Sequence, residues 1–177
     1  MQRGIFVLVV GSSGSGKNTL IAAAREANPS LAFAVSATTR PMREGEEDGV
    51  NYHYLTAEEF ARKVAAGEFL EWAEYGGNRY GTLRSELEPK LAEGKIILKD
   101  IEVQGVRQIR KILPRAEHRT IFIDAGSWEE LVARIQARAP MSESELVARH
   151  TRYDDERTFM SEADHVVSNK EGELESA

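Results

Sequence analysis

Short apolar segments are separated by segments in which apolar residues recur with a helical period. The lengths of both kinds of segment are those of strands and helices. The six apolar residues Ile5–Val10 form a continuous run, which is typical of a strand buried on both faces of a parallel sheet. Other short apolar segments predict strands at residues 31–35, 69–74, 96–101, 120–124 and 165–168. Because segments with a helical period lie between most of these strands, the pattern predicts an α/β fold with a mostly parallel sheet.

Boundary signals locate the helices between these strands. Thr56 with Glu59, and Ser127 with Glu130, have the spacing of capping boxes, in which two side chains satisfy free amides at a helix start. Together with the glycine and proline breaks that follow, these signals predict helices at residues 19–27, 56–67, 84–93, 104–113, 127–138 and 143–160. Residues 36–55 show no helical period, so loops and short strands are expected there.

The composition narrows the class of protein without changing this fold. The 177 residues suffice for one domain, and a formal net charge of -6 argues against binding nucleic acid by general attraction to phosphates. No apolar run reaches the length of about 18 residues that a membrane helix needs, so we expect neither a membrane span nor a signal peptide. The absence of cysteine excludes disulfides and thiolate metal sites and fits a cytoplasmic protein. The sequence does not indicate an oligomeric state.

A glycine-rich segment between the first strand and the first helix has the spacing of a phosphate-binding P-loop. Its glycines allow backbone amides to curl around an anion, the helix start adds partial positive charge, and Lys17 reaches the β- and γ-phosphates. A serine or threonine that helps to hold Mg²⁺ usually follows the lysine, whereas this chain has Asn18. The alternative is a glycine-rich turn without a ligand, but the flanking strand and helix favour an ATP site. The predicted ATP phosphate-binding residues are Gly11, Ser12, Ser13, Gly14, Ser15, Gly16, Lys17, Asn18 and Thr19.

Residues 36–52 combine two arginines, several hydroxyl groups and a tyrosine in one polar segment. The planar guanidinium groups of Arg40 and Arg43 match the oxygen atoms of a phosphate dianion, and a tyrosine hydroxyl can complete such a site. From the residue types alone, however, solvated arginines in a polar loop are the better explanation.

The order of residues in this segment, Ser-x-Thr-Thr-Arg-x-x-Arg-x-Gly-Glu-x-x-Gly-x-x-Tyr, resembles the substrate segment of the guanylate kinase family at every fixed position. Residues 67–74, 78–82 and 101–105 resemble later blocks of the same family, and the similarity runs from about residue 4 to 169. The resemblance implies a P-loop NTPase-type fold, with a parallel sheet flanked by helices, an inserted GMP-binding subdomain and a short mobile lid. It also implies transfer of the γ-phosphoryl group of ATP to GMP, which gives ADP and GDP.

On this basis the whole chain, residues 1–177, is expected to be a single guanylate-kinase-like domain with three parts. The core is expected to combine residues 1–35, 87–137 and 153–177. The GMP-binding subdomain is expected at residues 36–86, where the alternation of strands and helices lapses, and the lid at residues 138–152.

The resemblance also implies which residues bind GMP. Arg40, Arg43, Tyr52 and Tyr80 are expected to hold its phosphate, and Ser36, Glu71, Thr82 and Glu102 are expected to recognise guanine. The chemistry agrees, because guanine presents N1–H and N2–H₂ donors on one edge and carboxylates only accept hydrogen bonds. Adenine lacks the N1–H group, so a buried carboxylate facing it would stay unpaired, and such sites reject the wrong ligand about 10⁴-fold or more.

A second group of residues is expected, by resemblance, to act on the transferring phosphoryl group. The predicted catalytic residues are Lys17, Arg134, Arg138 and Arg149. Phosphoryl transfer depends mainly on positioning, Mg²⁺ and positive charge around the transferred group. We expect Asn18 and Asp100 to lie near Mg²⁺ bound as Mg-ATP, or Asp100 to orient Lys17, and Asn169 to lie near adenine. A solvated Arg149, and an Asp100 that only pairs with an arginine, are the structural alternatives.

Several positions depart from the family pattern. Glu102 stands where the family usually has Asp, Lys99 where it has an apolar strand residue, and Ala139-Pro140 where it has Gly-Thr beside the lid. The charge of Lys99 must therefore reach the surface or be paired, and the proline stiffens a hinge region.

Two other functions are compatible with parts of the sequence. Related kinases act on other small phosphate esters, such as ribose 1,5-bisphosphate, and often lack a hydroxyl residue after the P-loop lysine, as this chain does at Asn18. Non-catalytic guanylate-kinase-like domains of scaffold proteins bind partners, but they have typically lost the P-loop lysine or the substrate arginines. Glu71 and residues 36–52 argue against the first alternative, and Lys17 argues against the second.

Overall fold

The computed structural model describes residues 3–138 and 141–170, apart from the side chains of Arg138 and Ser144. The chain forms two compact units. The first contains Ser30–Lys99 with Met1–Val7 and Gln104–His118, and the second contains Leu8–Pro29, Asp100–Val103 and Arg119–Ala177. The predicted GMP-binding segment, residues 36–86, lies entirely in the first unit, and the P-loop and the predicted lid lie entirely in the second.

Five strands form a sheet of the order β2-β7-β1-β8-β9. They are β1 (Ile5–Val10), β2 (Ala32–Phe33), β7 (Ile96–Asp100), β8 (His118–Asp124) and β9 (His165–Ser168). β2 runs parallel to β7 with Phe33 opposite Leu98, and β9 runs parallel to β8 with Val166 opposite Phe122. The predicted α/β architecture is confirmed, although the second predicted strand shortens to two residues.

The first strand has the burial that its sequence predicts. All residues from Phe6 to Val10 are buried, although successive side chains of a strand point to opposite faces. β1 is therefore covered on both sides, as a continuous apolar run indicates. The chain leaves this strand directly into the P-loop, so the loop starts from a fixed, buried support.

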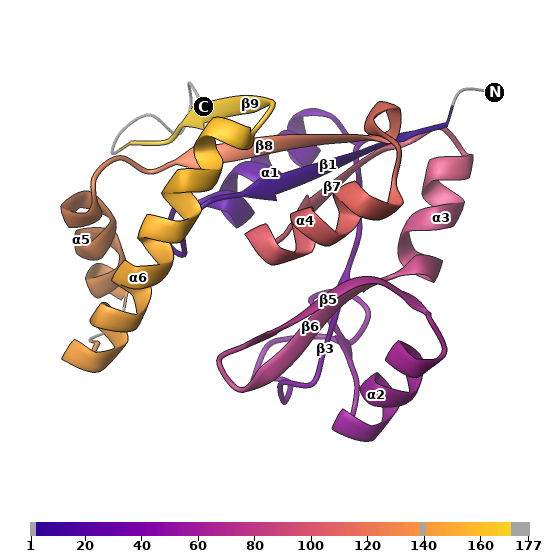
Figure 1. Cartoon of the computed structure of the whole chain (residues 1–177), viewed down its shortest axis with the longest axis horizontal. Helices are drawn as coiled ribbons and strands as arrows, with labels where there is room; N and C mark the ends of the chain where they lie inside the picture. The colour runs from indigo at the N-terminus through magenta and orange to yellow at the C-terminus, as the bar shows by residue number, and fades with distance from the viewer. Residues whose placement is uncertain (1–2, 139–140, 171–177) are drawn as a thin grey trace. The chain divides into compact units, whose positions relative to one another are not determined.

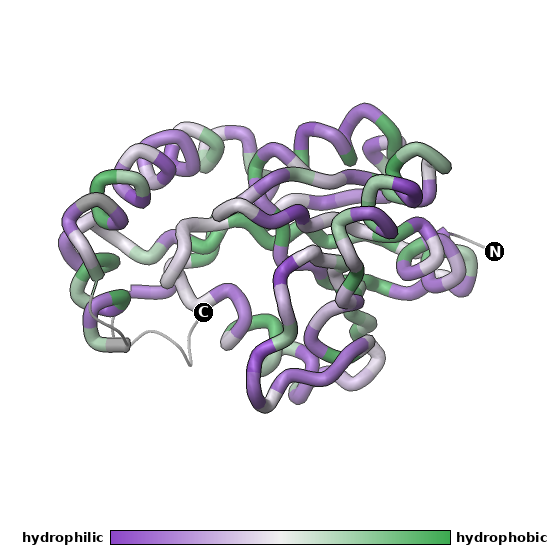
Figure 2. The backbone as a smooth tube through the Cα atoms, turned by 90° about the horizontal axis from the view of Figure 1, so that it is seen from below, coloured by the Kyte–Doolittle hydropathy of each residue, from purple (hydrophilic) through white to green (hydrophobic). Residues whose placement is uncertain are grey.

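The helices lie within two residues of their predicted ends. They are α1 (Lys17–Ala27), α2 (Ala57–Ala65), α3 (Arg84–Ala92), α4 (Val103–Ile112), α5 (Trp128–Arg138) and α6 (Glu143–Phe159), with the 3₁₀ turns η1 (Arg115–Glu117) and η2 (Met160–Glu162). Thr56 and Glu59 form the predicted capping box of α2. Figure 2 shows hydrophobic and hydrophilic residues interspersed along the helical turns of the chain, as helices with one apolar side require. None of the helices in the described ranges has the length and hydrophobicity of a membrane span.

A second sheet lies within the first unit and has the order β4-β3-β6-β5. Its strands are β3 (Ser36–Thr38), β4 (His53–Tyr54), β5 (Phe69–Tyr75) and β6 (Asn78–Leu83). The sequence pattern does not predict β6, because Asn78, Arg79 and Gly81 interrupt any apolar run. β6 forms because Gly76 and Gly77, at φ of 57° and 77°, turn the chain back from β5 into an antiparallel hairpin.

One face of this second sheet is apolar and is covered by α2. Ala37, Phe69 and Leu83 form a buried cluster with Phe60 of α2, and the rings of Phe60 and Phe69 stack at a centroid distance of 4.4 Å. Figure 1 shows α2 beside β3, β5 and β6. Because successive residues of a strand point to opposite faces, the neighbours of these apolar residues point to the other face of the sheet.

The second unit has a smaller apolar cluster between α5 and α6. Leu131 and Ile135 of α5 pack with Ala125 and with Tyr153 of α6, and Trp128 borders them. The rings of Trp128 and Tyr153 lie 5.5 Å apart between centroids. This cluster joins the two helices that carry the arginines expected to act on the transferring phosphoryl group, so it limits how those helices can move against each other.

Gly81 has close neighbours that exclude a larger residue. A Cβ atom at this position would lie 2.7 Å from the Glu71 carbonyl oxygen and 2.7 Å from Cδ1 of Phe69. We therefore expect Gly81→Ala to lower the free energy of unfolding by about 1–3 kcal/mol, the usual cost of overpacking. Urea titration followed by tryptophan fluorescence measures the change. Ser85→Ala, at an exposed position, should stay within about 0.5 kcal/mol of the wild type, and an equally small loss for Gly81→Ala would contradict the close approach.

Candidate functional site

Three glycines shape the P-loop between β1 and α1. Gly11, Gly14 and Gly16 have φ angles of 150°, 91° and 87°, a conformation that residues with a Cβ atom rarely adopt. Gly16 directly precedes Lys17, the first residue of α1. The free amides at this helix start carry partial positive charge and can bind an anion. The backbone therefore has the geometry of a phosphate-binding loop.

Lys17 folds back over this loop. Its Nζ atom donates hydrogen bonds to the carbonyl oxygens of Gly11 at 2.6 Å and Ser12 at 3.3 Å, and lies 3.8 Å from Oδ1 of Asp100. Asp100 thus contacts the lysine that it was expected to orient. The hydroxyl of Ser15 is buried and has no hydrogen-bond partner among the described residues, so it is available to a bound anion.

Asn169, which follows β9, binds the backbone of the P-loop through its side chain. Its amide Nδ2 donates to the carbonyl oxygen of Ser15 at 2.7 Å, and Arg134 of α5 donates to the Asn169 carbonyl oxygen at 2.7 Å. A Cβ atom on Gly16 would lie 2.3 Å from Asn169 Nδ2, so side chain and loop are in close contact. Asn169 therefore holds the loop backbone, and its expected contact with adenine stays a prediction.

Arg149 reaches the same loop from α6. Its Nη1 atom donates to Ser13 Oγ at 2.6 Å. Nη2 of Arg134 is buried without a hydrogen-bond partner among the described residues, which leaves a donor that an anion would satisfy. Arg134 and Arg149, two of the three arginines expected to act on the transferring phosphoryl group, thus lie near the P-loop within the second unit. The side chain of Arg138 and the predicted break at Ala139-Pro140 lie outside the described residues.

Carboxyl groups gather near Lys17. The pKa of Glu102 is raised to about 7, because protein atoms crowd its carboxyl group and because Glu156 and Asp100 carry like charges, while Lys17 opposes the rise. Glu102 as a whole residue is exposed, which limits how far the loss of hydration can raise its pKa. Repulsion from Glu156 and Asp100 raises the same pKa independently of burial. Glu156 is buried in the polar helix α6, where nothing in the sequence distinguishes it from solvated neighbours. Glu102 belongs to the second unit, and its expected contact with guanine stays a prediction.

In the first unit, strand pairing brings three predicted guanine-binding residues together. Thr82 of β6 lies opposite Ser36 of β3 and opposite Glu71 of β5. Residues directly opposite each other in an antiparallel pair point to the same face of a sheet. Ser36, Glu71 and Thr82 therefore share one face, which we name the polar face, opposite the apolar cluster that α2 covers.

A β-bulge in β5 puts Glu71 on this polar face. Phe69 lies opposite Leu83, and Glu71 lies opposite Thr82, so two residues of β5 correspond to one residue of β6. In a regular strand, Phe69 and Glu71 would point to the same face. With the bulge, Phe69 enters the apolar cluster and Glu71 joins the polar face.

The Glu71 carboxyl group is buried and held by a neighbour. Glu71 is 5% exposed, and the hydroxyl of Thr82 donates to its Oε1 atom at 2.6 Å. Burial raises the pKa of Glu71, while the bond from Thr82 and the positive charge of Lys99 act against this rise. Lys99 is itself buried and donates to the Ser36 hydroxyl. Of the two outcomes expected for Lys99, its charge does not reach the surface, and its ammonium group donates to a predicted guanine-binding residue.

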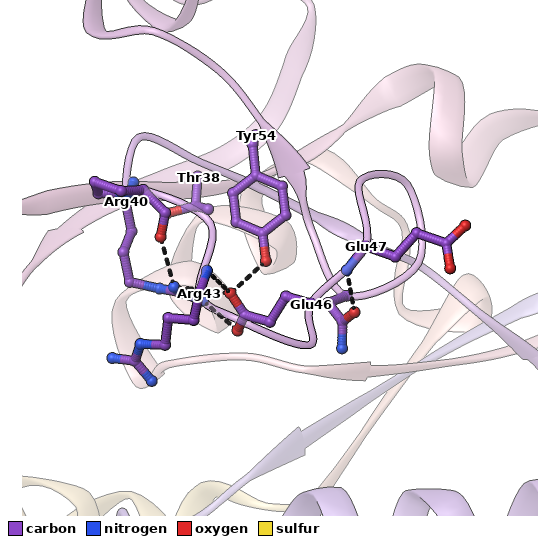
Figure 3. A network of polar contacts seen from close by, with 8 residues as sticks. Thr38, Arg40, Arg43, Glu46, Glu47 and Tyr54 are labelled. Carbon is purple, nitrogen blue, oxygen red and sulfur yellow. Dashed lines mark hydrogen bonds and ion pairs between the residues drawn. The ribbon is translucent and has the colours of Figure 1, made fainter.

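Arg40 is held by a carboxylate, Glu46, that is not among the predicted site residues. Its guanidinium group binds both carboxylate oxygens of Glu46, at 2.7 and 3.0 Å (Figure 3), and Tyr54 donates to the same carboxylate at 2.7 Å. The guanidinium carbon lies 5.3 Å from the centroid of the Tyr52 ring, which meets the Tyr80 ring edge to face at 6.0 Å. The structure therefore brings together three of the four residues expected to bind the GMP phosphate.

The fourth, Arg43, is placed differently. Its backbone amide donates to Glu46 at 2.8 Å, but Figure 3 shows its side chain extending away from that carboxylate. Within residues 3–138 and 141–170 the Arg43 guanidinium forms no hydrogen bond or ion pair. A phosphate at this place would thus find the Arg40 guanidinium held by Glu46 and the Arg43 guanidinium without such a bond in the described part of the chain. Glu46 occupies the one glutamate position of the residue pattern at 36–52, so the sequence did contain a signal for it. Tyr54 lies outside that pattern.

Comparisons with known proteins point to one family. The sequence model of the family described as guanylate kinase matches residues 3–176. A guanylate kinase of Synechococcus sp. (strain JA-3-3Ab) is 44% identical over 167 residues, which cover 94% of this chain and 76% of that protein. A guanylate kinase of Rubrobacter xylanophilus is 44% identical over 173 residues, 98% of this chain and 90% of that protein. The crystal structure of guanylate kinase from Anaplasma phagocytophilum matches with a TM-score of 0.75 and 28% identity, over 99% of this chain and 81% of that one.

The ion pair of Glu46 makes a prediction about pH. Hydrogen bonds from Arg40 and from the Arg43 amide lower the pKa of Glu46 from 4.5 to about 2. Because the folded-state pKa lies below the unfolded one, the carboxylate stabilises the fold above about pH 4.5, and this stabilisation is lost as pH falls towards about 2. We expect wild type to be more stable than Glu46→Gln at neutral pH, with a difference that shrinks between about pH 5 and 2. Urea titrations across this range measure the difference. Glu44→Gln, at an exposed position, is the matched control, and a difference for Glu46→Gln that is independent of pH would contradict the ion pair.

Proposed function

Because the chain belongs to the guanylate kinase family and is therefore an ATP:GMP phosphotransferase, we propose which of its residues bind each substrate. The P-loop of the second unit holds ATP, and the polar face of the first unit, with the neighbouring arginines and tyrosines, holds GMP. The observation that carries the GMP assignment is the buried Glu71 carboxylate between strands that also present Ser36 and Thr82. A buried acceptor of this kind suits a base with N–H donors on its edge.

Guanine satisfies the polar face, and adenine does not. Thr82 already donates to one oxygen of Glu71, so the other oxygen accepts from N1–H or N2–H₂ of guanine. Adenine has no N1–H group and would leave this buried carboxylate without a partner, which is unfavourable. For Glu102, the family resemblance alone supports a contact with guanine.

The phosphate of GMP binds beside this face. Arg40 is held in place by Glu46 and lies against Tyr52, which contacts Tyr80. Arg43 adds a second guanidinium group from the same segment. Charge-assisted bonds from arginine to phosphate are short and strong, and a fixed arginine loses little conformational freedom when it forms them.

The second unit prepares the γ-phosphoryl group for transfer. An oxygen atom of the GMP phosphate attacks the γ-phosphorus of ATP in line, a new P–O bond forms, and the bond to the β-phosphate oxygen breaks to release ADP. The attacking oxygen is already anionic near neutral pH, so the step needs no general base. Lys17, Arg134, Arg138 and Arg149 stabilise the charge on the transferred group, and Asn169 lies near adenine.

Mg²⁺ accompanies ATP in this proposal. No three His, Cys, Asp or Glu side chains of the described part of the chain gather into a cage that could hold a metal ion. Mg²⁺ commonly binds substrate phosphates and water with only one or two protein oxygens, and the donors near Lys17 fit this requirement. Asp100, whose side chain is 34% exposed, offers carboxylate oxygens, and the exposed Asn18 offers an amide oxygen. When bound, the ion neutralises charge on the β- and γ-phosphates.

The remaining assignments rest on the same resemblance. A GMP-binding subdomain at residues 36–86 and a lid at residues 138–152 belong to a single domain, whose core combines residues 1–35, 87–137 and 153–177. A cytoplasmic location, and the absence of nucleic-acid and membrane partners, stay predictions.

A substrate panel tests the function. The protein is incubated with ATP, Mg²⁺ and one of GMP, AMP, CMP, UMP or ribose 1,5-bisphosphate, and ADP release is measured. We expect ADP with GMP, and a kcat/KM for AMP that is lower by about 10⁴-fold. Lys17→Met should fold normally and lose turnover by about 10²-fold or more, because it removes a charge that stabilises the transferred group. ADP release with the sugar phosphate alone would reject GMP as the substrate, and full activity of Lys17→Met would reject the P-loop assignment.

A substitution at Glu71 tests the guanine assignment separately. Glu71→Gln keeps the shape of the side chain but replaces a charged acceptor, so we expect KM for GMP to rise about 10- to 100-fold while KM for ATP stays unchanged. Steady-state kinetics with each substrate varied in turn measure both constants. Glu74→Gln, at an exposed position of the same strand, is the matched control and should change neither constant. Equal rises in KM for GMP and for ATP would show that Glu71 does not recognise guanine.

A further inference from the structure

Lys99 is a buried lysine that follows three apolar residues of β7. It is 2% exposed, and Ile97 and Leu98 before it are buried as well. The family pattern has an apolar residue at this position. Burying an ammonium group is unfavourable unless the charge is paired and hydrogen-bonded, so the surroundings of Lys99 must compensate for its presence.

The compensation comes from residues around the polar face. Nζ of Lys99 donates to Oγ of Ser36 and lies 5.9 Å from the centroid of the Phe33 ring. The positive charge of Lys99 also favours the ionised form of the buried Glu71 carboxyl group. All of these partners belong to the first unit. Lys99 therefore connects two of the residues proposed to read guanine.

The bond from Lys99 restricts what Ser36 can do. A serine hydroxyl has one hydrogen to donate and two lone pairs that accept, whereas an ammonium group only donates. When Lys99 donates to Oγ, the hydroxyl hydrogen points away from the ammonium group and remains available to a ligand. The bond also polarises the hydroxyl, which strengthens it as a donor.

Thr82 and Glu71 present the opposite polarity. Because the Thr82 hydroxyl donates to Oε1 of Glu71, this pair offers a ligand the remaining carboxylate oxygen, which is an acceptor. Thr82 lies opposite both Ser36 and Glu71 in the sheet, so the donor and the acceptor lie on either side of it on one face. Guanine has the matching edge, since its O6 accepts while N1–H and N2–H₂ donate. Adenine carries an amino donor in place of O6.

We propose that Lys99 is a positioning residue for base recognition, which holds Ser36 as a hydrogen-bond donor to O6 of guanine and so favours 6-oxopurine nucleotides. This inference rests on the proposed function, in which Ser36 and Glu71 bind the base. It adds a residue that acts through Ser36 without touching the substrate. A lysine that only balanced the charge of Glu71, or only supported the fold, would affect nucleotides alike whether or not they carry O6.

The test compares GMP with two analogues in wild type and Lys99→Met. One analogue has sulfur in place of O6 and reports the Ser36 contact, because sulfur is a weak acceptor. The other, inosine monophosphate, lacks the 2-amino group and reports the Glu71 contact. Dissociation constants are measured by calorimetry at about pH 8.5, where the raised pKa of Glu71 matters least. We expect the preference for GMP over the sulfur analogue to fall about tenfold in Lys99→Met, while the preference for GMP over inosine monophosphate stays unchanged.

Further variants make the result specific. If Lys99 acts through Ser36, Lys99→Met should cause no additional loss of preference in a Ser36→Ala background. Lys99→Leu carries the residue type of the family pattern and serves as a second variant if Lys99→Met does not fold. Lys90→Met is the matched control, because it removes another lysine of the first unit, which donates to the Phe33 carbonyl oxygen at 2.9 Å and to Glu86 at 2.8 Å. It should leave both preferences unchanged.

An unchanged preference for GMP over the sulfur analogue in a folded Lys99 variant would overturn the inference, and so would an equal loss of affinity for all three nucleotides. If wild type phosphorylates GMP and the variants keep its preference, this inference alone fails. If wild type neither binds nor phosphorylates GMP, the proposed function fails, and the inference that rests on it fails as well.

Discussion

Within three residues, β5 has to supply an aromatic ring to a hydrophobic core and a carboxylate to a polar face. Phe69 stacks on Phe60 of α2, and Glu71 accepts a hydrogen bond from Thr82 on the other side of the sheet. A regular strand cannot do both, because residues two apart point to the same face. The bulge between Phe69 and Glu71 removes the conflict. The covering of this sheet by α2 and the assembly of the polar face both depend on it.

The polar groups around this face satisfy one another before a substrate arrives. Thr82 donates to Glu71, Lys99 donates to Ser36, and Glu46 holds Arg40. These contacts matter for folding, because a buried polar group without a partner costs more than a typical hydrogen bond contributes. They also matter for binding, because each contact leaves a defined donor or acceptor for a ligand. Groups that are already held lose little conformational freedom when that ligand binds.

Local sequence patterns predicted the elements that depend on neighbouring residues. β1 and the capping box of α2 follow from short stretches of chain, and both were predicted correctly. β6 and the bulge in β5 were not predicted, because pairing and register are properties of two strands together. The same distinction applies to the site. The spacing of glycines and lysine predicted the P-loop, whereas the contacts of Tyr54 and of Lys99 depend on the folded structure.

Lys17 and Lys99 show how the partners of a lysine decide what it does. Lys17 donates to two backbone carbonyl oxygens, and a phosphate dianion is a stronger acceptor that can replace them. Lys99 is 2% exposed, so its charge must be balanced inside the fold, where the Glu71 carboxylate is also buried. The positive charge of Lys99 favours the ionised form of that carboxyl group. The first lysine can therefore act directly on a substrate, whereas the second acts by fixing the hydrogen-bonding direction of its neighbour.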